Sequence, residues 1–282
     1  MTTDGSVRDT RHSDVVPRRV GSDVLASSLA RVAALQHELE LRTDVPPAGD
    51  WWRCHHLLTD RTWFSRWHRR LADWLIEHHG AAPARTVSGY VLWWYLRLPA
   101  YVGALLLHHE RRVPLLRPSE LAFRISRDSR PDPVGVAVLG RSFYCLPLDP
   151  CAGRPEAVVV ADERALAEVY RARFVAHATA FIRAYRPLSP HGARTLWAAA
   201  TDAIDSCLWW AGVQGGDEGA GVADAALVLD ARHEPLTSSS TLRRHTGDNG
   251  SVGWTRRRES CCFTYLLPGS TECETCPRTC PR

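Results

Sequence analysis

The stretch RRRESCCFTYLLPGSTECETC, residues 256–276, decides how the C-terminal end of this chain folds. It carries four cysteines in the pattern C-C-x10-C-x2-C, namely Cys261, Cys262, Cys273 and Cys276. The side chains of residues 263–267 alternate as they do in a strand, and Pro268-Gly269 predicts a turn that returns the chain. We therefore expect the two cysteine pairs to meet.

Cysteines in this spacing predict a metal centre. A [2Fe-2S] cluster is held by four thiolates, and Cys273 and Cys276 are spaced so that they can bend around one metal. A structural zinc site also takes four cysteines, usually from two C-x2-C pairs. The adjacent Cys261 and Cys262 suit that arrangement poorly, because neighbouring side chains on an extended backbone point to opposite faces. The residues favour the cluster, with zinc and a regulatory disulfide between Cys261 and Cys262 as the alternatives.

Cysteine use elsewhere agrees with an intracellular metal site. The chain has nine cysteines, and Cys280 is a fifth one close to the C-terminus, which we leave outside the ligand set. The first twenty residues lack the apolar stretch of a secretory signal. We therefore expect a cytoplasmic protein, whose thiols stay reduced rather than forming a disulfide framework.

Composition sets further bounds on function. At 282 residues, with 45% hydrophobic and 23% charged residues, the chain can build a substantial core. Its net charge of +4 argues against nucleic acid as the main partner. All 35 basic residues are arginine, so lysine chemistry such as a Schiff base is excluded.

Hydrophobic periodicity predicts an α+β fold: a mostly helical domain with a small antiparallel sheet, followed by a small C-terminal iron-sulfur module. Apolar residues recur at helical spacing in four stretches. These are residues 22–42, 60–79, 162–185 and 191–212. Two more helices, rather than a membrane span, are expected on either side of Pro99, because a proline inside a helix breaks or kinks it. Alternation within residues 121–148 predicts the sheet.

The remaining segments complete the organisation. Residues 221–230 fit a helix or a strand, and the glycines of 215–221 predict a loop without a nucleotide-binding spacing. Residues 231–250 are rich in Ser, Thr and Gly and read as a connector. The predicted division is a flexible tail, a helical α+β domain and a [2Fe-2S]-binding module. Their bounds are 1–20, 21–249 and 250–282.

Tryptophans and nucleotide motifs bear on a ligand site and on the source of electrons. Trp63, Trp67 and Trp74 recur at helical spacing and predict core positions, whereas Trp51 and Trp52 fit no such pattern and leave a place in a pocket wall open. No G-x-G-x-x-G motif follows a predicted strand, so a nicotinamide or flavin site is unsupported. Electrons are expected from a separate ferredoxin-like protein or a small reductant.

The arginine-rich lead-in, the vicinal cysteines, the apolar segment ending in Leu-Pro-Gly and the final C-x2-C-P resemble the ferric siderophore reductases of the FhuF type. The resemblance covers residues 256–277 only, and Cys280 departs from it. It implies cytoplasmic reduction of Fe(III) in an imported siderophore, often a hydroxamate, so that weakly held Fe(II) is released. It also implies that a [2Fe-2S] cluster is held by Cys261, Cys262, Cys273 and Cys276.

The run Arg256–Arg258 leaves alternatives open. Three guanidinium groups near a negatively charged cluster could stabilise its reduced form or dock an acidic electron donor, or the run could be a solvated basic stretch. No catalytic residue beyond the cluster ligands is indicated. Two other function classes remain: a non-catalytic iron-sulfur sensor or regulator, and a binding protein stabilised by zinc.

Overall fold

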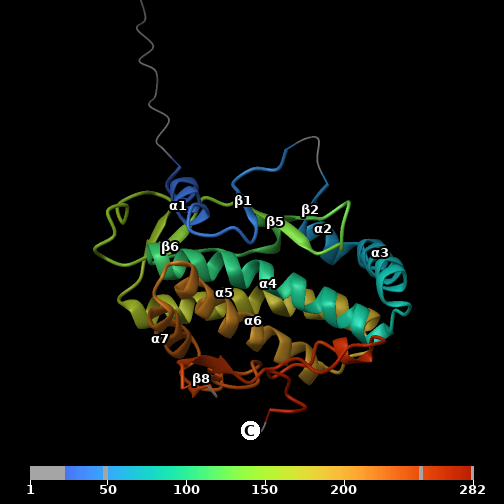
Figure 1. Cartoon of the computed structure of the whole chain (residues 1–282). Coiled ribbons are helices and arrows are strands. Elements are labelled where there is room, and N and C mark those ends of the chain that lie inside the picture. The colour runs from blue at the N-terminus through green and yellow to red at the C-terminus, as the bar shows by residue number, and fades with distance from the viewer. Residues whose placement is uncertain (1–22, 47–49, 248–249, 281–282) are drawn as a thin grey trace, which may run out of the picture.

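The computed structural model describes residues 23–46, 50–247 and 250–280; the predicted tail, residues 1–20, lies outside them. Three long helices run through the middle of the molecule, with a sheet and shorter helices on one side and the C-terminal segment on the other (Figure 1). They are α4 (Ala84–Glu110), α5 (Glu163–Tyr185) and α6 (Ala193–Gln214). The predicted α+β class with a dominant helical part is confirmed.

Helix α4 is one continuous element, so the prediction of two helices around Pro99 is wrong. It is long and apolar enough to cross a membrane, but 83% of its apolar window is buried inside the fold. Pro99 itself is buried. Packing on nearly every face outweighs the one backbone hydrogen bond that a proline removes.

The shorter helices α2 (Cys54–Thr59) and α3 (Thr62–His79) follow the first strands, and α3 confirms the helix predicted over 60–79. The first helix, α1 (Val24–Ala33), is much shorter than the predicted range 22–42. It ends because the Gln36 side chain accepts hydrogen bonds from the backbone N–H groups of Glu38 and Leu39, which turns the chain out of the helix.

Two sheets replace the single antiparallel one that was predicted. The first has the order β1-β5-β4-β2, with β4 antiparallel to β5 and β1 parallel to it. The second, β3-β6-β7, pairs β6 parallel to β7. The three runs of alternating residues predicted within 121–148 form the strands β4, β5 and β6. The strands are β1 (Glu40–Arg42), β2 (Trp51–Arg53), β3 (Arg112–Pro114), β4 (Leu121–Ile125), β5 (Pro133–Val138), β6 (Phe143–Cys145) and β7 (Ala157–Val159), with the 3-10 turns η1 (Pro118–Glu120) and η2 (Arg186–Leu188).

The segment after α6 is helical where a loop was predicted: α7 (Glu218–Val228) starts within the glycine-rich stretch. Glycine allows α6 and α7 to touch, because a Cβ on Gly212 would lie 2.6 Å from the Cα of Gly221. The predicted connector 231–250 contains β8 (Leu242–Thr246), which pairs antiparallel with β9 (Val252–Arg256). This hairpin leads the chain into the cysteine segment.

Candidate metal centre

The first cysteine pair lies against the N-terminal part of α4. The hydroxyl of Thr86 donates a hydrogen bond to the carbonyl of Phe263 (2.8 Å), and the hydroxyl groups of Tyr90 and Thr264 are 2.9 Å apart. A Cβ on Gly89 would lie only 3.2 Å from the carbonyl oxygen of Cys262. The glycine therefore lets the backbone of the cysteine pair rest directly on the helix.

A buried carboxylate on α6 holds the residues that precede the cysteines. Asp202 is 1% exposed. Its two oxygens accept hydrogen bonds from the backbone N–H groups of Glu259 and Ser260, each at 2.8 Å, and from the Ser260 hydroxyl at 2.5 Å. Its own carbonyl accepts from the Arg256 guanidinium at 3.0 Å. One side chain thus joins the segment to the core of the helical domain.

The chain returns to bring the second cysteine pair to the first, as predicted. The N–H of Arg258 donates to the carbonyl of Thr275 (3.1 Å), between the two cysteines of the C-x2-C pair. The predicted turn is present, with Gly269 at φ 73° and the N–H of Ser270 bonded to the Leu267 carbonyl. The predicted strand over 263–267 is wrong, because the chain forms the 3-10 helix η3 (Thr264–Leu266) there.

The four predicted ligands lie close enough to interact as pairs. The thiol of Cys261 interacts with those of Cys262 and Cys276, and Cys273 likewise interacts with Cys262 and Cys276. Cys276 is 1% exposed, and the other three are half-buried. All nine cysteines, which lie within the described ranges, are free thiols.

The four free thiols match the donor set of a [2Fe-2S] cluster. A structural zinc ion needs four ligands around one centre, whereas a [2Fe-2S] cluster spreads four thiolates over a pair of irons. The set of four thiols therefore fits the cluster.

The vicinal pair favours one thiolate. A hydrogen bond from the Cys261 thiol, aided by the hydroxyl of Thr264 at 3.1 Å and the charge of Arg258, lowers the pKa of Cys262 to about 4. The same hydrogen bond raises the pKa of Cys261. A thiolate is the form that binds metal, so the hydrogen bond within this pair favours the metal-binding form of Cys262.

The arginine run is not a solvated stretch. Arg256 is 7% exposed, and the side chains of Arg257 and Arg258 are 15% and 12% exposed. Burial opposes the charge of Arg258, but Asp202 and the sulfurs of Cys262 and Cys273 raise its pKa. Its Nε is buried and has no hydrogen-bond partner in the described part of the chain. The Nε lies 4.0 Å from a carboxylate oxygen of Asp202, so the guanidinium holds its charge between this carboxylate and the thiols.

Comparison with known families agrees with this geometry: residues 258–278 match the family model described as FhuF 2Fe-2S C-terminal domain. The C-terminal segment is a FhuF-type 2Fe-2S domain. The predicted resemblance and the predicted [2Fe-2S] cofactor are thereby confirmed. The match covers only this FhuF-type segment, and none of the curated proteins matches the chain. The match identifies an iron-sulfur protein by this segment alone.

Cys280 lies next to the FhuF-type segment without joining the four cysteines. Its Sγ contacts the carbonyl of Glu274 at 3.0 Å, and its own carbonyl accepts a hydrogen bond from Arg257. This placement is consistent with its exclusion from the ligand set.

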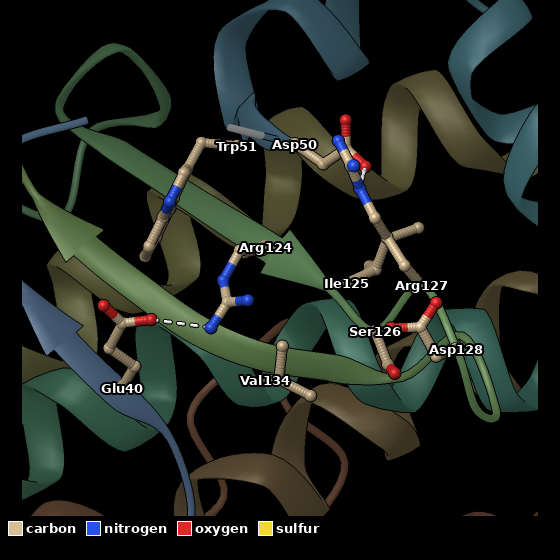
Figure 2. Close-up of a pocket in the computed structure, with 9 residues that line it drawn as sticks. All are labelled: Glu40, Asp50, Trp51, Arg124, Ile125, Ser126, Arg127, Asp128 and Val134. Atoms are coloured by element: carbon tan, nitrogen blue, oxygen red, sulfur yellow. Dashed lines mark hydrogen bonds and ion pairs between the residues drawn. The ribbon is translucent and has the colours of Figure 1, made fainter. Parts of the chain in front are cut away.

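A hollow of about 920 Å³ lies on the four-stranded sheet, on the other side of the three long helices from the FhuF-type segment (Figure 1). Figure 2 shows Trp51 on its wall and Arg124 paired with Glu40 at 2.7 Å. Trp52 is buried instead, with its ring 5.0 Å from that of Trp63. The two tryptophans that fitted no pattern in the sequence therefore have different roles. Trp51 lines a hollow, whereas Trp52 belongs to the core, like Trp67.

Sequence reasoning missed the residues that seat the FhuF-type segment. Asp202 and Asp205 stand in an otherwise apolar part of α6, and both are buried. Acidic residues are almost never buried without partners, so two of them on an apolar helix are a signal for a tertiary anchor. Gly89 and Thr86 on α4 carry no comparable signal.

Proposed function

We propose that this protein is a cytoplasmic ferric-siderophore reductase that delivers one electron to Fe(III) and releases Fe(II). The observation that carries the proposal is the FhuF-type 2Fe-2S segment, in which each of the four cysteines interacts with two of the others. We propose Cys261, Cys262, Cys273 and Cys276 as the cluster ligands. A bound [2Fe-2S] cluster would supply the one-electron chemistry.

The residues of the chain have three tasks in this proposal. The four thiols bind, Asp202 and α4 orient the backbone that carries them, and Arg258 places a positive charge beside them. The electron must come from outside, from a ferredoxin-like donor or a small reductant, as the sequence indicates. Siderophore oxygens are hard ligands that hold Fe(II) far less tightly than Fe(III), so no proton-transferring side chain is required.

The first test concerns the ligands. Anaerobically purified protein should be red-brown, with about two irons per chain, which is the iron content of one [2Fe-2S] cluster. Cys262→Ser and Cys273→Ser should each abolish the visible absorbance, while Cys280→Ser, as the matched control, should leave it unchanged. A colourless protein with stoichiometric zinc would select the zinc-stabilised binding protein.

The second test separates a reductase from a sensor. Dithionite-reduced protein is mixed anaerobically with a ferric siderophore and a ferrous chelator. Reoxidation of the protein with stoichiometric Fe(II) capture is the expected result. A coloured protein that fails to reoxidise would be a sensor or regulator.

A further inference from the structure

A second concave surface lies beside the cysteine segment. It has a volume of about 390 Å³ and is lined by residues from α6, from the loop 237–241, from β8 and from the arginine run. Arg257 connects it with the FhuF-type segment, because its guanidinium donates to the carbonyls of Pro277 and Cys280 while its side chain lines the hollow. Pro277 directly follows the proposed ligand Cys276, so the hollow and the cysteine site share a wall.

The charge of this hollow is positive and unbalanced. Three guanidinium groups line it, from Arg194, Arg243 and Arg257, together with one carboxylate, Glu259. Glu259 is already paired with Arg257 at 3.2 Å. Arg194 and Arg243 are exposed and form no ion pair within the described residues. Two free positive charges from segments far apart in the sequence therefore face one cavity.

The wall is held in place before any ligand binds. Asp205, buried on α6, accepts hydrogen bonds from the Ser240 hydroxyl (2.6 Å) and from both the N–H and the hydroxyl of Thr241. The N–H of Thr237 donates to the hydroxyl of Thr201 at 2.9 Å. Between these anchors lies Ser238, which lines the hollow, while its hydroxyl oxygen is buried in the wall and has no hydrogen-bond partner in the described part of the chain. The wall therefore holds a polar group whose hydrogen bond is still to be made.

We propose that this hollow binds the ferric siderophore through anionic oxygens and selects complexes with net negative charge, such as hydroxycarboxylate or catecholate complexes. This inference rests on the proposed function and names its substrate class. This substrate class differs from the hydroxamate that the family resemblance led us to expect: three hydroxamates neutralise Fe(III), so a tris-hydroxamate complex offers no net charge to Arg194 and Arg243. Guanidinium groups pair well with carboxylate and catecholate oxygens. A concave site also suits a small complex better than the flat face of an acidic electron carrier.

The test uses gallium complexes, because Ga(III) copies the size and charge of Fe(III) without being reduced. Binding of Ga(III)-citrate, of the neutral cyclic trihydroxamate Ga(III)-desferrioxamine E and of citrate alone is measured by calorimetry on the cluster-loaded protein. We expect Ga(III)-citrate to bind at least about tenfold more tightly than either of the others, with an affinity that falls as salt is added.

Paired variants locate the site. Arg194→Gln with Arg243→Gln should weaken Ga(III)-citrate binding about tenfold. Arg244→Gln is the matched control, since Arg244 is the next residue on β8 but lies over Trp254 and does not line the hollow. The Arg244→Gln variant should bind Ga(III)-citrate with unchanged affinity. Equal binding of the neutral complex, equal binding of citrate alone or an unchanged double variant would each overturn the inference.

Two outcomes separate this inference from the proposed function. If Ga(III)-citrate binds as expected but the reduced protein does not reduce ferric citrate, the binding site in the hollow is supported and the proposed reductase function is refuted. If the reductase works and the double variant has the wild-type KM for ferric citrate, the inference fails. A double variant that loses only its rate with an acidic ferredoxin as donor would assign the arginines to protein docking, which also contradicts the inference.

Discussion

Arg258 is a buried arginine whose charge faces sulfur atoms. Its side chain is 12% exposed and lies beside Asp202, Cys262 and Cys273. A [2Fe-2S] cluster with four thiolates becomes more negative on reduction, and a nearby positive charge stabilises that state. Arg258→Gln should therefore lower the reduction potential, by about 60 mV if the lost stabilisation equals a tenfold change for one electron.

The control for this prediction is Arg278→Gln. Arg278 is two residues from Cys276, but it is exposed and lies on the ring of Tyr265, with 4.1 Å between the guanidinium carbon and the ring centre. Potentiometric titration of both variants, followed by visible absorbance, measures the effect. An Arg258 variant with the wild-type potential and a full cluster would show that this charge does not tune the site.

At this residue scale the sequence predicted the sulfur atoms but not what holds them. The spacing of Cys261 to Cys276 is a local property, and ligand chemistry can be read from it directly. The role of Asp202 depends on its contacts with Glu259 and Ser260, which lie 57 and 58 positions further along the chain. Periodicity within one element carries no information on such a contact.

The crossing of α6 and α7 depends on glycine. A Cβ at Gly221 would lie 2.7 Å from the carbonyl oxygen of Leu208 and 2.9 Å from the Cα of Gly212. Because both neighbours are backbone atoms, the helices must move apart to admit it. Gly221→Ala should lower the free energy of unfolding by about 2 kcal/mol, within the range for overpacked cores, as measured by urea denaturation.

Gly219→Ala, on the same helix α7, should have the opposite effect on the free energy of unfolding. A Cβ there would meet only a side-chain oxygen of Asp217, at 3.5 Å. Alanine is the better helix former, so this variant should be more stable by roughly 0.5–1 kcal/mol. Equal effects of the two substitutions would show that helix propensity, rather than the close approach, governs both positions.

At the scale of elements, amphipathic helices were the most predictable part. The helix α3 has one buried and one charged face, and α5 begins at the capping residue Asp162; both were predicted within a few residues. Helix α4 was not, because a segment buried on nearly all sides shows no periodicity and Pro99 suggested a break. The segment 263–267 alternates as a strand does, but it has no partner strand: its backbone hydrogen bonds close the 3-10 turn η3, and Phe263 and Thr264 bond to α4.

The stability of the whole molecule should depend on pH through its buried histidines. Burial lowers the pKa of His177 to about 4, and that of His68 likewise. Burial keeps His177 neutral, although its Nδ1–H donates to the Leu116 carbonyl (2.7 Å), which partly opposes the shift; Nε2 accepts from the hydroxyl of Tyr95. Below the ordinary histidine pKa of about 6.5, His177 is protonated in the unfolded chain but stays neutral in the folded chain.

Stability contributed by His177 is thus fully present above about pH 6.5 and is lost as the pH falls towards 4, by on the order of 3 kcal/mol. Urea denaturation of the native chain and of His177→Gln across this interval measures it. The variant should lose part of the slope of unfolding free energy against pH. The exposed His37→Gln should keep the full slope; identical slopes for all three chains would refute the assignment.

The division into domains remains a prediction, and the predicted boundary at 249–250 falls within the hairpin of β8 and β9. The metal-binding end of the chain has little regular structure of its own, and its backbone takes its shape from Asp202 on α6 and from Thr86 and Gly89 on α4. It follows that residues 250–280 cannot be transferred alone to another protein. On a foreign scaffold they would keep the four cysteines but would lose the contacts with α4 and α6 that determine the backbone conformation.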